Sequence, residues 1–237
     1  KNQILHEIES FVAKEDRIKI NIIKLTNTSG QKKKLKLLYY IKPVLGEDEI
    51  QTNGYIDVGM SNNVVIAKNL YTDNFKGDIA YVGSSEKIKS YTGSKNVFVG
   101  NGKIDEPQAL NKVALGNSSG LGENSCIAIE LEVELGQYET KEITLFLGED
   151  SNEINVKDIA YKYSNISKAK EELNKVINFW YELLTRIQVK TPLESMNIML
   201  NGWAMYQTIS SRLCGRTGFY QSGGAYGFRD QLQDTLC

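Results

Sequence analysis

The chain has 237 residues, of which 41% are hydrophobic and 24% are charged, a composition typical of an ordinary soluble globular protein. Its 28 basic and 29 acidic residues nearly cancel, so the charge pattern gives no footprint for nucleic acid. No apolar run approaches the roughly 20 residues that span a bilayer, and the first residues lack the apolar core and cleavage site of a signal peptide. We therefore expect a cytoplasmic protein with one large domain, or with one domain plus part of another. Because the sequence does not begin with Met, we also expect an internal piece of a longer chain.

The cysteines and the single histidine indicate neither a metal site nor a catalytic thiol. Cys126, Cys214 and Cys237 are widely spaced and odd in number, and no CxxC pair or histidine partner accompanies them. We expect reduced thiols and no cofactor. His6 lies far upstream of the cysteines in a predicted strand, where a surface position is favoured over a catalytic one.

From about residue 4 to residue 160 the pattern predicts β-structure. Residues 17–26 (RIKINIIKLT) alternate in polarity, and residues 27–30 (NTSG) have the chemistry of a turn. The next run, residues 32–44, places apolar side chains at alternate positions on one face: Leu35, Leu37, Tyr39 and Ile41. The lysines at 32–34 are interpreted as the solvated end of a hairpin rather than a binding patch.

Four further strands are predicted between clusters of Gly, Asn, Asp and Ser, at residues 64–67, 78–83, 126–135 and 140–147. Residues 136–139 (GQYE) join the last two and predict a hairpin. Many short strands with this spacing indicate an antiparallel β-sandwich.

Residues 97–121 differ from the strands around them, because they form a long stretch rich in glycine that contains Pro107. Long loops in compact domains are often functional. A loop that only covers the core explains this stretch equally well.

Helical periodicity replaces the strand pattern near residue 165. Apolar side chains then recur on one helix face, at Ile166, Ala169, Leu173, Val176, Ile177, Trp180, Leu184 and Ile187. Ser167 is the predicted N-cap. We expect Trp180 to be a packing residue rather than a ligand contact.

A second helix is predicted to begin at Thr191. Thr191 is the expected cap, Pro192 occupies the first helical position and Glu194 completes a capping box. From Leu193 to Met205 the helix is apolar on most sides, so it requires a larger helical domain around it. We expect the chain to stop in the middle of that domain.

Residues 212–234 combine arginines, aspartates, glutamines, aromatic residues and the Gly223–Gly224 pair. Glycines permit close approach of the backbone to a ligand, arginines bind anions or hydroxyls, and Asp and Gln supply acceptors and amides. This mixture suits a polyhydroxylated or anionic ligand better than a hydrophobic core.

The segment NGWAMYQTISSRLCGRTGFYQSGGAYGFRDQLQD (residues 201–234) resembles the opening of the catalytic domain of glycoside hydrolase family 94. That family comprises the inverting phosphorylases of cellobiose, chitobiose and β-1,2-glucooligosaccharides. Three upstream stretches resemble its N-terminal β-sandwich: KEDRIKINIIKLTNTSG, KNVFVGNGKIDEPQAL and the predicted hairpin ending in LFLGE. The resemblance therefore covers nearly the whole chain, and it is most marked with the phosphorylase-like C-terminal region of cyclic β-1,2-glucan synthases.

The resemblance implies an architecture of three parts. Residues 1–160 would form the β-sandwich and residues 161–190 a helical linker. Residues 191–237 would form the first helices of an (α/α)6 barrel, which is incomplete within this sequence.

The resemblance also implies a reaction and its partners, a β-linked oligosaccharide and phosphate. Phosphate attacks the anomeric carbon directly, so the protein has to supply only a general acid. The family's acid, an aspartate, lies in a motif expected beyond Cys237, and neither Asp230 nor Asp234 takes its place. The 237 residues alone are therefore expected to lack phosphorylase activity. Phosphate is a co-substrate here and no cofactor is implied.

By the same resemblance, the residues that bind the donor sugar are Arg229, Asp230, Asp234 and Gln221. Asp230 and Asp234 are four residues apart, which places them on one face of a helix. Arg229 is adjacent to Asp230 and would hold its carboxylate in place. The alternative for the two aspartates is a structural role near the positive end of a helix dipole.

The residues expected to face phosphate are Arg216, Ser222, Gly223 and Gly224, through the guanidinium and backbone N–H groups. A tight structural turn explains the glycines almost as well. Arg212 belongs to the preceding helix and is interpreted as a cap for its C-terminal end.

Two other functions remain open beside a phosphorylase fragment. One is a non-catalytic carbohydrate-binding module that uses the sandwich alone, and binding of a β-glucan to residues 1–160 would favour it. The other is an assembly module that packs against the barrel or forms a homo-oligomer. Self-association through the apolar helix at residues 193–205 would favour this second function.

Overall fold

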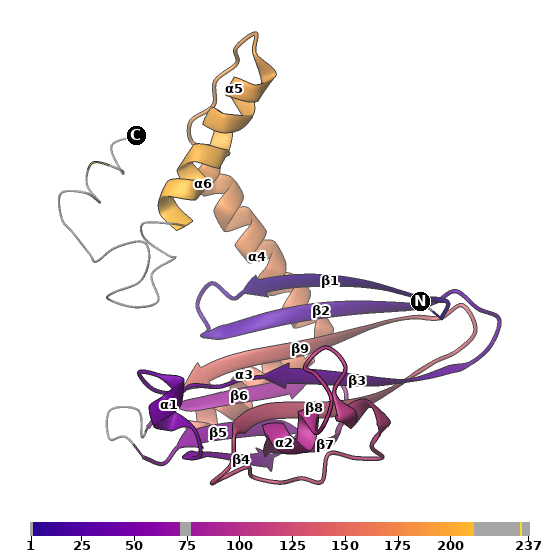
Figure 1. Ribbon diagram of the computed structural model, residues 1–237. Coiled ribbons are helices and arrows are strands. Elements are labelled where there is room, and N and C mark those ends of the chain that lie inside the picture. Colours follow the sequence, from indigo (N-terminus) through magenta and orange to yellow (C-terminus); the bar gives the residue numbers. More distant parts are fainter. Residues whose placement is uncertain (1, 72–76, 211–232, 234–237) are drawn as a thin grey trace. The chain divides into compact units, whose positions relative to one another are not determined.

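The computed structural model describes residues 2–71, 77–210 and 233. The chain divides into two compact units, Lys1–Asn174 and Lys175–Cys237. The first unit is built mainly of strands, while the described part of the second contains helices and loops (Figure 1). None of the helices in the described part of the chain is both long enough and apolar enough to cross a bilayer.

The larger sheet of the first unit is antiparallel, with strands in the order β1-β2-β9-β6-β5-β4. Their bounds are β1 Ile4–Val12, β2 Ile18–Asn27, β4 Ile56–Ser61, β5 Val64–Asn69, β6 Ile79–Ser84 and β9 Thr140–Asp150. His6 lies on the edge strand β1 opposite Leu25, which confirms its predicted place in a strand. The sequence pattern did not predict β4.

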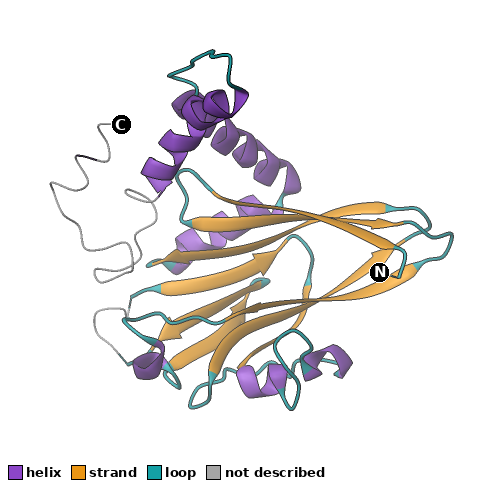
Figure 2. Cartoon of the chain, turned by 45° about the horizontal axis from the view of Figure 1, so that its top comes forward, coloured by secondary structure: helices purple, strands orange, loops and turns teal. Residues whose placement is uncertain are grey.

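The smaller sheet has the order β3-β8-β7 and packs face to face with the larger one (Figure 2). Its strands are β3 Lys33–Ile41, β7 Ile88–Ser94 and β8 Ser125–Leu135, of which β7 was not predicted. Apolar side chains from both sheets form one buried core that includes Ile23, Val58, Val82, Ile129, Leu131 and Leu145. The predicted face of β3 packs against this core through Leu35, Leu37, Tyr39 and Ile41. The prediction of an antiparallel sandwich is therefore confirmed.

The predicted hairpin at residues 136–139 is wrong. β8 belongs to the small sheet and β9 to the large one, so this turn carries the chain from one sheet to the other. The same holds for residues 28–32, between β2 and β3, and the lysine run therefore does not end a hairpin. The lysines are nevertheless on a solvated face, where Lys32 and Lys34 form exposed ion pairs with β8.

Asn27 fixes the two crossings to each other. It is fully buried, and its amide donates to the carbonyl oxygens of Gln31 (2.7 Å) and Gly136 (2.6 Å). Its side-chain oxygen accepts hydrogen bonds from the N–H and hydroxyl of Ser29. A buried side-chain amide needs acceptors, and each crossing supplies one of them to Asn27. Two strands adjacent in sequence can therefore separate into different sheets without leaving these groups unpaired.

The first unit also contains a helix inside the region predicted to be β-rich, α3 (Glu153–Ser164). The side chain of Asn152 caps it by accepting from the N–H of Ile154 (2.8 Å), and it packs on β6 and β9. Tyr163 is buried, and its hydroxyl donates to Asp16 (2.6 Å). Burial, followed by this contact, raises the pKa of Tyr163. Because α3 covers one face and the shared core covers the other, β6 is buried at every position.

The long stretch at residues 97–121 covers the outer face of the small sheet. It includes the end of α2 (Lys95–Val99) and the short helix η2 (Gln108–Asn111). Phe98, Ala109 and Leu115 are buried there against β8. Between the two interpretations of this loop, the observed packing favours the covering role. A further short helix, α1 (Glu49–Thr52), precedes β4.

The predicted helix near residue 165 is α4 (Ile166–Leu184). Ser167 is not its cap: the side-chain oxygen of Asn165 accepts from the N–H groups of Ser167 (2.9 Å) and Lys168 (3.4 Å). Asn165 is the C-cap residue of α3 and its side chain caps α4, so one helix ends and the next begins at this residue. Ala169 on the predicted stripe is buried, whereas Ile177 and Ile187 are exposed.

The second unit contains α5 (Glu194–Ile198), the π-helical turn η3 (Met199–Trp203) and α6 (Ala204–Ile209). The capping box predicted at Thr191 does not form, since the helix begins two residues later with Leu193 at its N-cap position. Thr191 is instead held by Asn197, whose side-chain oxygen accepts from the backbone N–H (2.7 Å) and hydroxyl (2.9 Å) of Thr191.

Candidate functional site

The side chains predicted to bind sugar and phosphate lie outside the residues that the structure describes. This applies to Gln221, Arg229, Asp230 and Asp234, to Arg216, Ser222, Gly223 and Gly224, and to Arg212, Cys214 and Cys237. Their roles stay predictions. The described structure shows the helices that lead to them and the surface of the sandwich.

The helical run that leads to the predicted site is bent at Asn201 and Gly202. Gly202 has φ +127°, a conformation that side-chain-bearing residues rarely adopt, and Asn201 also leaves helical geometry. Asn201 secures the bend, because its amide and side-chain oxygen bond the carbonyl (2.8 Å) and N–H (2.7 Å) of Val189. Gly202 is the one buried residue in the described stretch 175–210. The predicted uninterrupted helix is therefore two helical pieces joined by a fixed bend.

Aromatic side chains gather beside this bend. Trp180 of α4 lies edge-on to Tyr206 of α6, with ring centroids 5.4 Å apart, and Trp203 lies 6.2 Å from the same tyrosine. These contacts confirm the packing role predicted for Trp180. Most of the apolar side chains nearby are exposed, namely Leu193, Met196, Ile198, Met199, Leu200 and Trp203.

A charged cluster lies on the outer face of the small sheet, centred on Glu130. This carboxylate is only 1% exposed, accepts a hydrogen bond from Ser90 (3.0 Å) and pairs with Lys89 (3.0 Å). Lys36 is 3.7 Å away and donates to backbone carbonyls of the covering loop, including that of Ala109. The charges satisfy one another and anchor the loop, so this cluster has a structural role.

Cys126 is buried in β8, and burial raises the pKa of its thiol to about 12. A thiol of that pKa is protonated at neutral pH and is a poor nucleophile. Within residues 2–71, 77–210 and 233, no group of three or more His, Cys, Asp or Glu side chains is placed to hold a metal ion.

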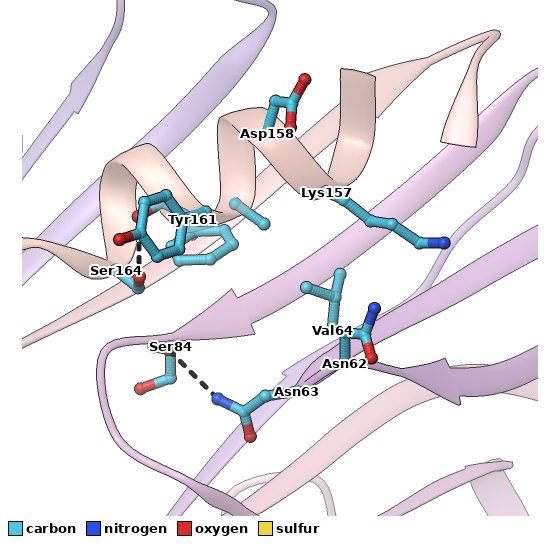
Figure 3. Close-up of a pocket in the computed structure, with 10 residues that line it drawn as sticks. Asn62, Asn63, Val64, Ser84, Lys157, Asp158, Tyr161 and Ser164 are labelled. Atoms are coloured by element: carbon cyan, nitrogen blue, oxygen red, sulfur yellow. Dashed lines mark hydrogen bonds between the residues drawn. The ribbon is translucent and has the colours of Figure 1, made fainter. Parts of the chain in front are cut away.

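A cavity of about 320 Å³ lies between α3 and the ends of β5 and β6 (Figure 3). Its lining includes Asn62, Ser84, Lys157 and Tyr161. The sequence did not predict this cavity, because α3 itself was not predicted. The Asn62-Asn63 pair between two apolar runs was the available signal, since adjacent asparagines favour the tight turns that join hairpin strands.

The comparison with protein families decides the identity of the fold. A sequence model of the glycosyl hydrolase 94 supersandwich domain matches residues 1–166. The chain belongs to glycoside hydrolase family 94. A second sequence model, the catalytic domain of the glycosyl hydrolase 94 superfamily, matches residues 179–237. A family 94 supersandwich is thus followed by the start of a family 94 catalytic domain.

Three curated proteins are similar in sequence to this family 94 chain. It is 30% identical over 236 residues to the cyclic beta-(1,2)-glucan synthase NdvB of Rhizobium meliloti (strain 1021), covering 97% of this chain and 8% of that protein. It is 24% identical over 237 residues to the N,N'-diacetylchitobiose phosphorylase of Vibrio furnissii, covering 95% of this chain and 29% of that protein. It is 26% identical over 235 residues to the solabiose phosphorylase of Paenibacillus borealis, covering 94% of this chain and 29% of that protein. The chain therefore spans less than a third of the length of each.

Proposed function

We propose that this chain is the N-terminal part of an inverting glycoside phosphorylase or of a cyclic β-1,2-glucan synthase-like glycosyltransferase. The enzyme would act on β-linked glucosides with phosphate and form a sugar 1-phosphate. The observation that carries the proposal is the succession of two family 94 domains along one chain, residues 1–166 and 179–237. Two kinds of phosphorylase and a glucan synthase among the relatives support this reaction class.

The proposed division of labour assigns residues 1–160 to the sandwich, residues 161–190 to a helical linker and residues 191–237 to the start of an (α/α)6 catalytic domain. The bend at Gly202 supports a positioning role for the last of these, because it lies shortly before the predicted ligand-binding residues and is held by hydrogen bonds rather than by packing alone.

The proposed chemistry follows from the residue types. A phosphate oxygen forms a bond to the anomeric carbon as the bond from that carbon to the glycosidic oxygen breaks, and a general acid protonates the departing oxygen. Arg229, Asp230, Asp234 and Gln221 would hydrogen-bond the donor sugar. The phosphate would lie against Arg216 and the backbone of the Ser222–Gly224 turn, where a guanidinium and N–H groups suit an anion. The general acid is expected beyond Cys237.

The decisive experiment uses the natural protein that contains this sequence. It is incubated with phosphate and a panel of β-linked glucose disaccharides and β-1,2-glucan, and release of sugar 1-phosphate is measured. Asp230→Asn should lower kcat/KM by about 100-fold, because hydrogen bonds to the sugar strengthen in the transition state. Asp105→Asn, at an exposed loop position of the sandwich, is the matched control and should leave kcat/KM unchanged.

Two results would overturn parts of this proposal. Absence of phosphorolysis across the panel would remove the reaction class. Turnover by the isolated 237 residues would remove the expected position of the general acid, while leaving the family unchanged.

A second candidate function is a non-catalytic carbohydrate-binding or assembly module. The exposed apolar side chains of α5 and η3 favour the assembly version, because such a surface is costly to leave in water. Concentration-dependent self-association of the 237 residues, abolished by Leu200→Glu, would support it. If the natural protein that contains this sequence also shows no phosphorolysis, the assembly function replaces the phosphorylase proposal.

A further inference from the structure

The cavity between α3 and the large sheet has the dimensions of a small-molecule site. Its volume is about 320 Å³, at the lower end of the range of about 300–1,000 Å³ that ligand pockets occupy. Both of its walls are regular structure: α3 on one side, and the ends of β5 and β6 on the other (Figure 3). It lies within the first unit and contains none of the residues predicted to bind sugar or phosphate for catalysis.

The turn between β4 and β5 presents one free amide to this cavity. Asn62 and Asn63 both have positive φ, +50° and +63°, as a two-residue hairpin turn requires. Asn63 is used structurally: it donates to the carbonyl of Glu86 (3.1 Å) and accepts from the N–H of Ile88 (2.7 Å). Asn62 forms no side-chain hydrogen bond with any residue that the structure describes, so its donor and acceptor are both available.

The cavity combines an apolar floor with a polar rim. Val64, Phe146 and Ala160 line it and are buried. At one end, the ammonium group of Lys157 lies on the same side as the Asn62 amide, while Tyr161 lies toward the other end with Ser164 and Ser84 (Figure 3). The adjacent Asp158 carboxylate points away from the strands.

Ser84 borders the cavity, but its hydroxyl points away from α3 (Figure 3), because Ser84 is on the same face of β6 as the core residue Val82. The residue is 2% exposed, and its hydroxyl oxygen accepts from the N–H of Glu86 (3.1 Å). The free polar groups on the rim of the cavity are therefore the Asn62 amide and the Tyr161 phenol. Tyr161 is 83% exposed on α3 and likewise has no partner for its phenol group among the described residues.

We infer that this cavity binds a neutral polyhydroxylated ring, a single hexose unit of a saccharide, at a site separate from the catalytic one. Hydroxyl groups of a sugar both donate and accept, and they match an amide and a phenol, which do the same. The carbon face of the ring matches the floor of Val64, Phe146 and Ala160. An anion is disfavoured because the lining contains one cation, Lys157, and one carboxylate, Asp158, and so has no net positive charge. An apolar ligand would leave the polar rim without partners.

This inference does not rest on the proposed reaction, because the binding it describes needs no turnover. The experiment follows backbone and side-chain amide signals of the isotope-labelled 237-residue chain by NMR. The probes are glucose, a β-1,2-linked glucose disaccharide and inorganic phosphate. For so small a ligand we expect a Kd on the order of millimolar. Saturable shifts caused by either sugar should centre on Asn62, Ser84 and Tyr161.

Two variants and a control test the assignment. Tyr161→Ala should weaken sugar binding at least fivefold. Asn62→Gly should weaken it as well, and it preserves the turn because glycine adopts positive φ without strain. The control is Tyr181→Ala, the same substitution at an exposed tyrosine of α4 outside the cavity, which should leave the Kd unchanged.

Several outcomes would overturn the site. These are the absence of saturable shifts with both sugars, equal binding by wild type and Tyr161→Ala, and saturation by phosphate but not by sugar. Because phosphorolysis is measured separately, failure here leaves the catalytic proposal intact, and loss of phosphorolysis in Asp230→Asn leaves this site intact.

Discussion

The sandwich and the helical residues that follow it differ in how much of their apolar surface they cover. The sandwich encloses a continuous core that includes fully buried residues such as Ile129 and Leu131 from β8. In the described stretch 175–210, Gly202 alone is buried, and side chains as large as Leu193 and Trp203 are half exposed. Stability in helices comes mainly from packing an apolar face. The sandwich therefore carries its own stability, whereas these helices depend on contacts outside residues 175–210.

Both regions nevertheless use the same device to fix their irregular segments. In the sandwich, the buried amide of Asn27 bonds two sheet crossings. In the helical residues, Asn197 and Asn201 bond the backbone of Thr191 and Val189. Asn27 is fully buried, but the other two are only partly so. The same hydrogen bonds should thus contribute more in the sandwich, where the asparagine side chain itself is shielded from water.

The largest expected effect comes from separating the two units. Residues 1–174 expressed alone should fold cooperatively, with dispersed NMR signals and a single unfolding transition, because their core is internal. Residues 175–237 expressed alone should lack fixed tertiary structure or aggregate. Far-UV circular dichroism and analytical ultracentrifugation of the two pieces measure this. A stable monomeric fold for residues 175–237 would show that the exposed side chains need no further partner.

Two leucine substitutions measure the difference in packing between the sandwich core and the helical residues. Leu131→Ala, in the core, should lower the free energy of unfolding by about 2–5 kcal/mol, since it removes buried contacts and leaves a cavity. Leu200→Ala, at a side chain with 42% exposure, should change it by less than about 0.5 kcal/mol. Urea denaturation followed by circular dichroism measures both. Equal destabilisation by the two would mean that Leu200 is packed in solution.

The asparagine contrast gives the next largest effect. Asn27→Ala should cost about 2–3 kcal/mol, because the carbonyls of Gln31 and Gly136 lose a buried partner. Asn197→Ala is the matched variant and should cost about 1 kcal/mol or less, since water reaches its partners. Both tryptophans, Trp180 and Trp203, lie in the second unit, so their fluorescence reports the effect of Asn197→Ala. Circular dichroism of the sheets reports the effect of Asn27→Ala. The reverse order of the two costs would contradict the argument from burial.

The sequence was sufficient to predict the parts of the sandwich that depend on local pattern. Period-two alternation located β2 and β3 to within a few residues, and the predicted face of β3 is the one packed on the core. Clusters of turn residues similarly delimited β5, β6, β8 and β9. Which strands pair was not predictable in the same way. The turn at residues 136–139 has the chemistry of a hairpin but joins two sheets, because pairing depends on contacts far apart in the sequence, such as β9 with β2.

The start of α4 was predicted at the wrong residue because two nearby side chains can both serve as its N-cap. Ser167 and Asn165 both have the chemistry of a cap, and only the end of α3 at Ser164 decides between them. Helix α3 was missed because exposed apolar residues such as Ile154 and Tyr161 lie between its buried ones, Val156, Ala160 and Tyr163, and obscure the helical pattern. Because α3 forms one wall of the cavity, the sequence pattern did not predict the cavity either. The predicted sugar and phosphate residues, in contrast, rest on a family resemblance that the structure does not test.

The smallest expected effect concerns the exposed ion pairs that border the small sheet. Lys34 lies 2.6 Å from Glu132 and Lys32 lies 2.6 Å from Glu134, and these hydrogen bonds hold the pKa values of both carboxyls below their ordinary value of 4.5. The folded state therefore binds protons less readily than the unfolded state. Its stabilisation is fully present above pH 4.5 and is lost as the pH falls through the lowered folded pKa values. The effect should be small, because both pairs are exposed and screened by water.

The double variant Glu132→Gln and Glu134→Gln should accordingly flatten the fall in stability below pH 4.5 and have little effect on its slope near neutral pH. Glu47→Gln, at an exposed position with no ion-pair partner among the described residues, should leave the profile unchanged. Urea unfolding midpoints measured across this pH range at low salt provide the comparison, and raising the salt should reduce the difference. Because the pairs lie on the sandwich, the change should appear in the sheet signal and not in tryptophan fluorescence. A change confined to fluorescence would mean that the helical residues, rather than the sandwich, set the response to acid.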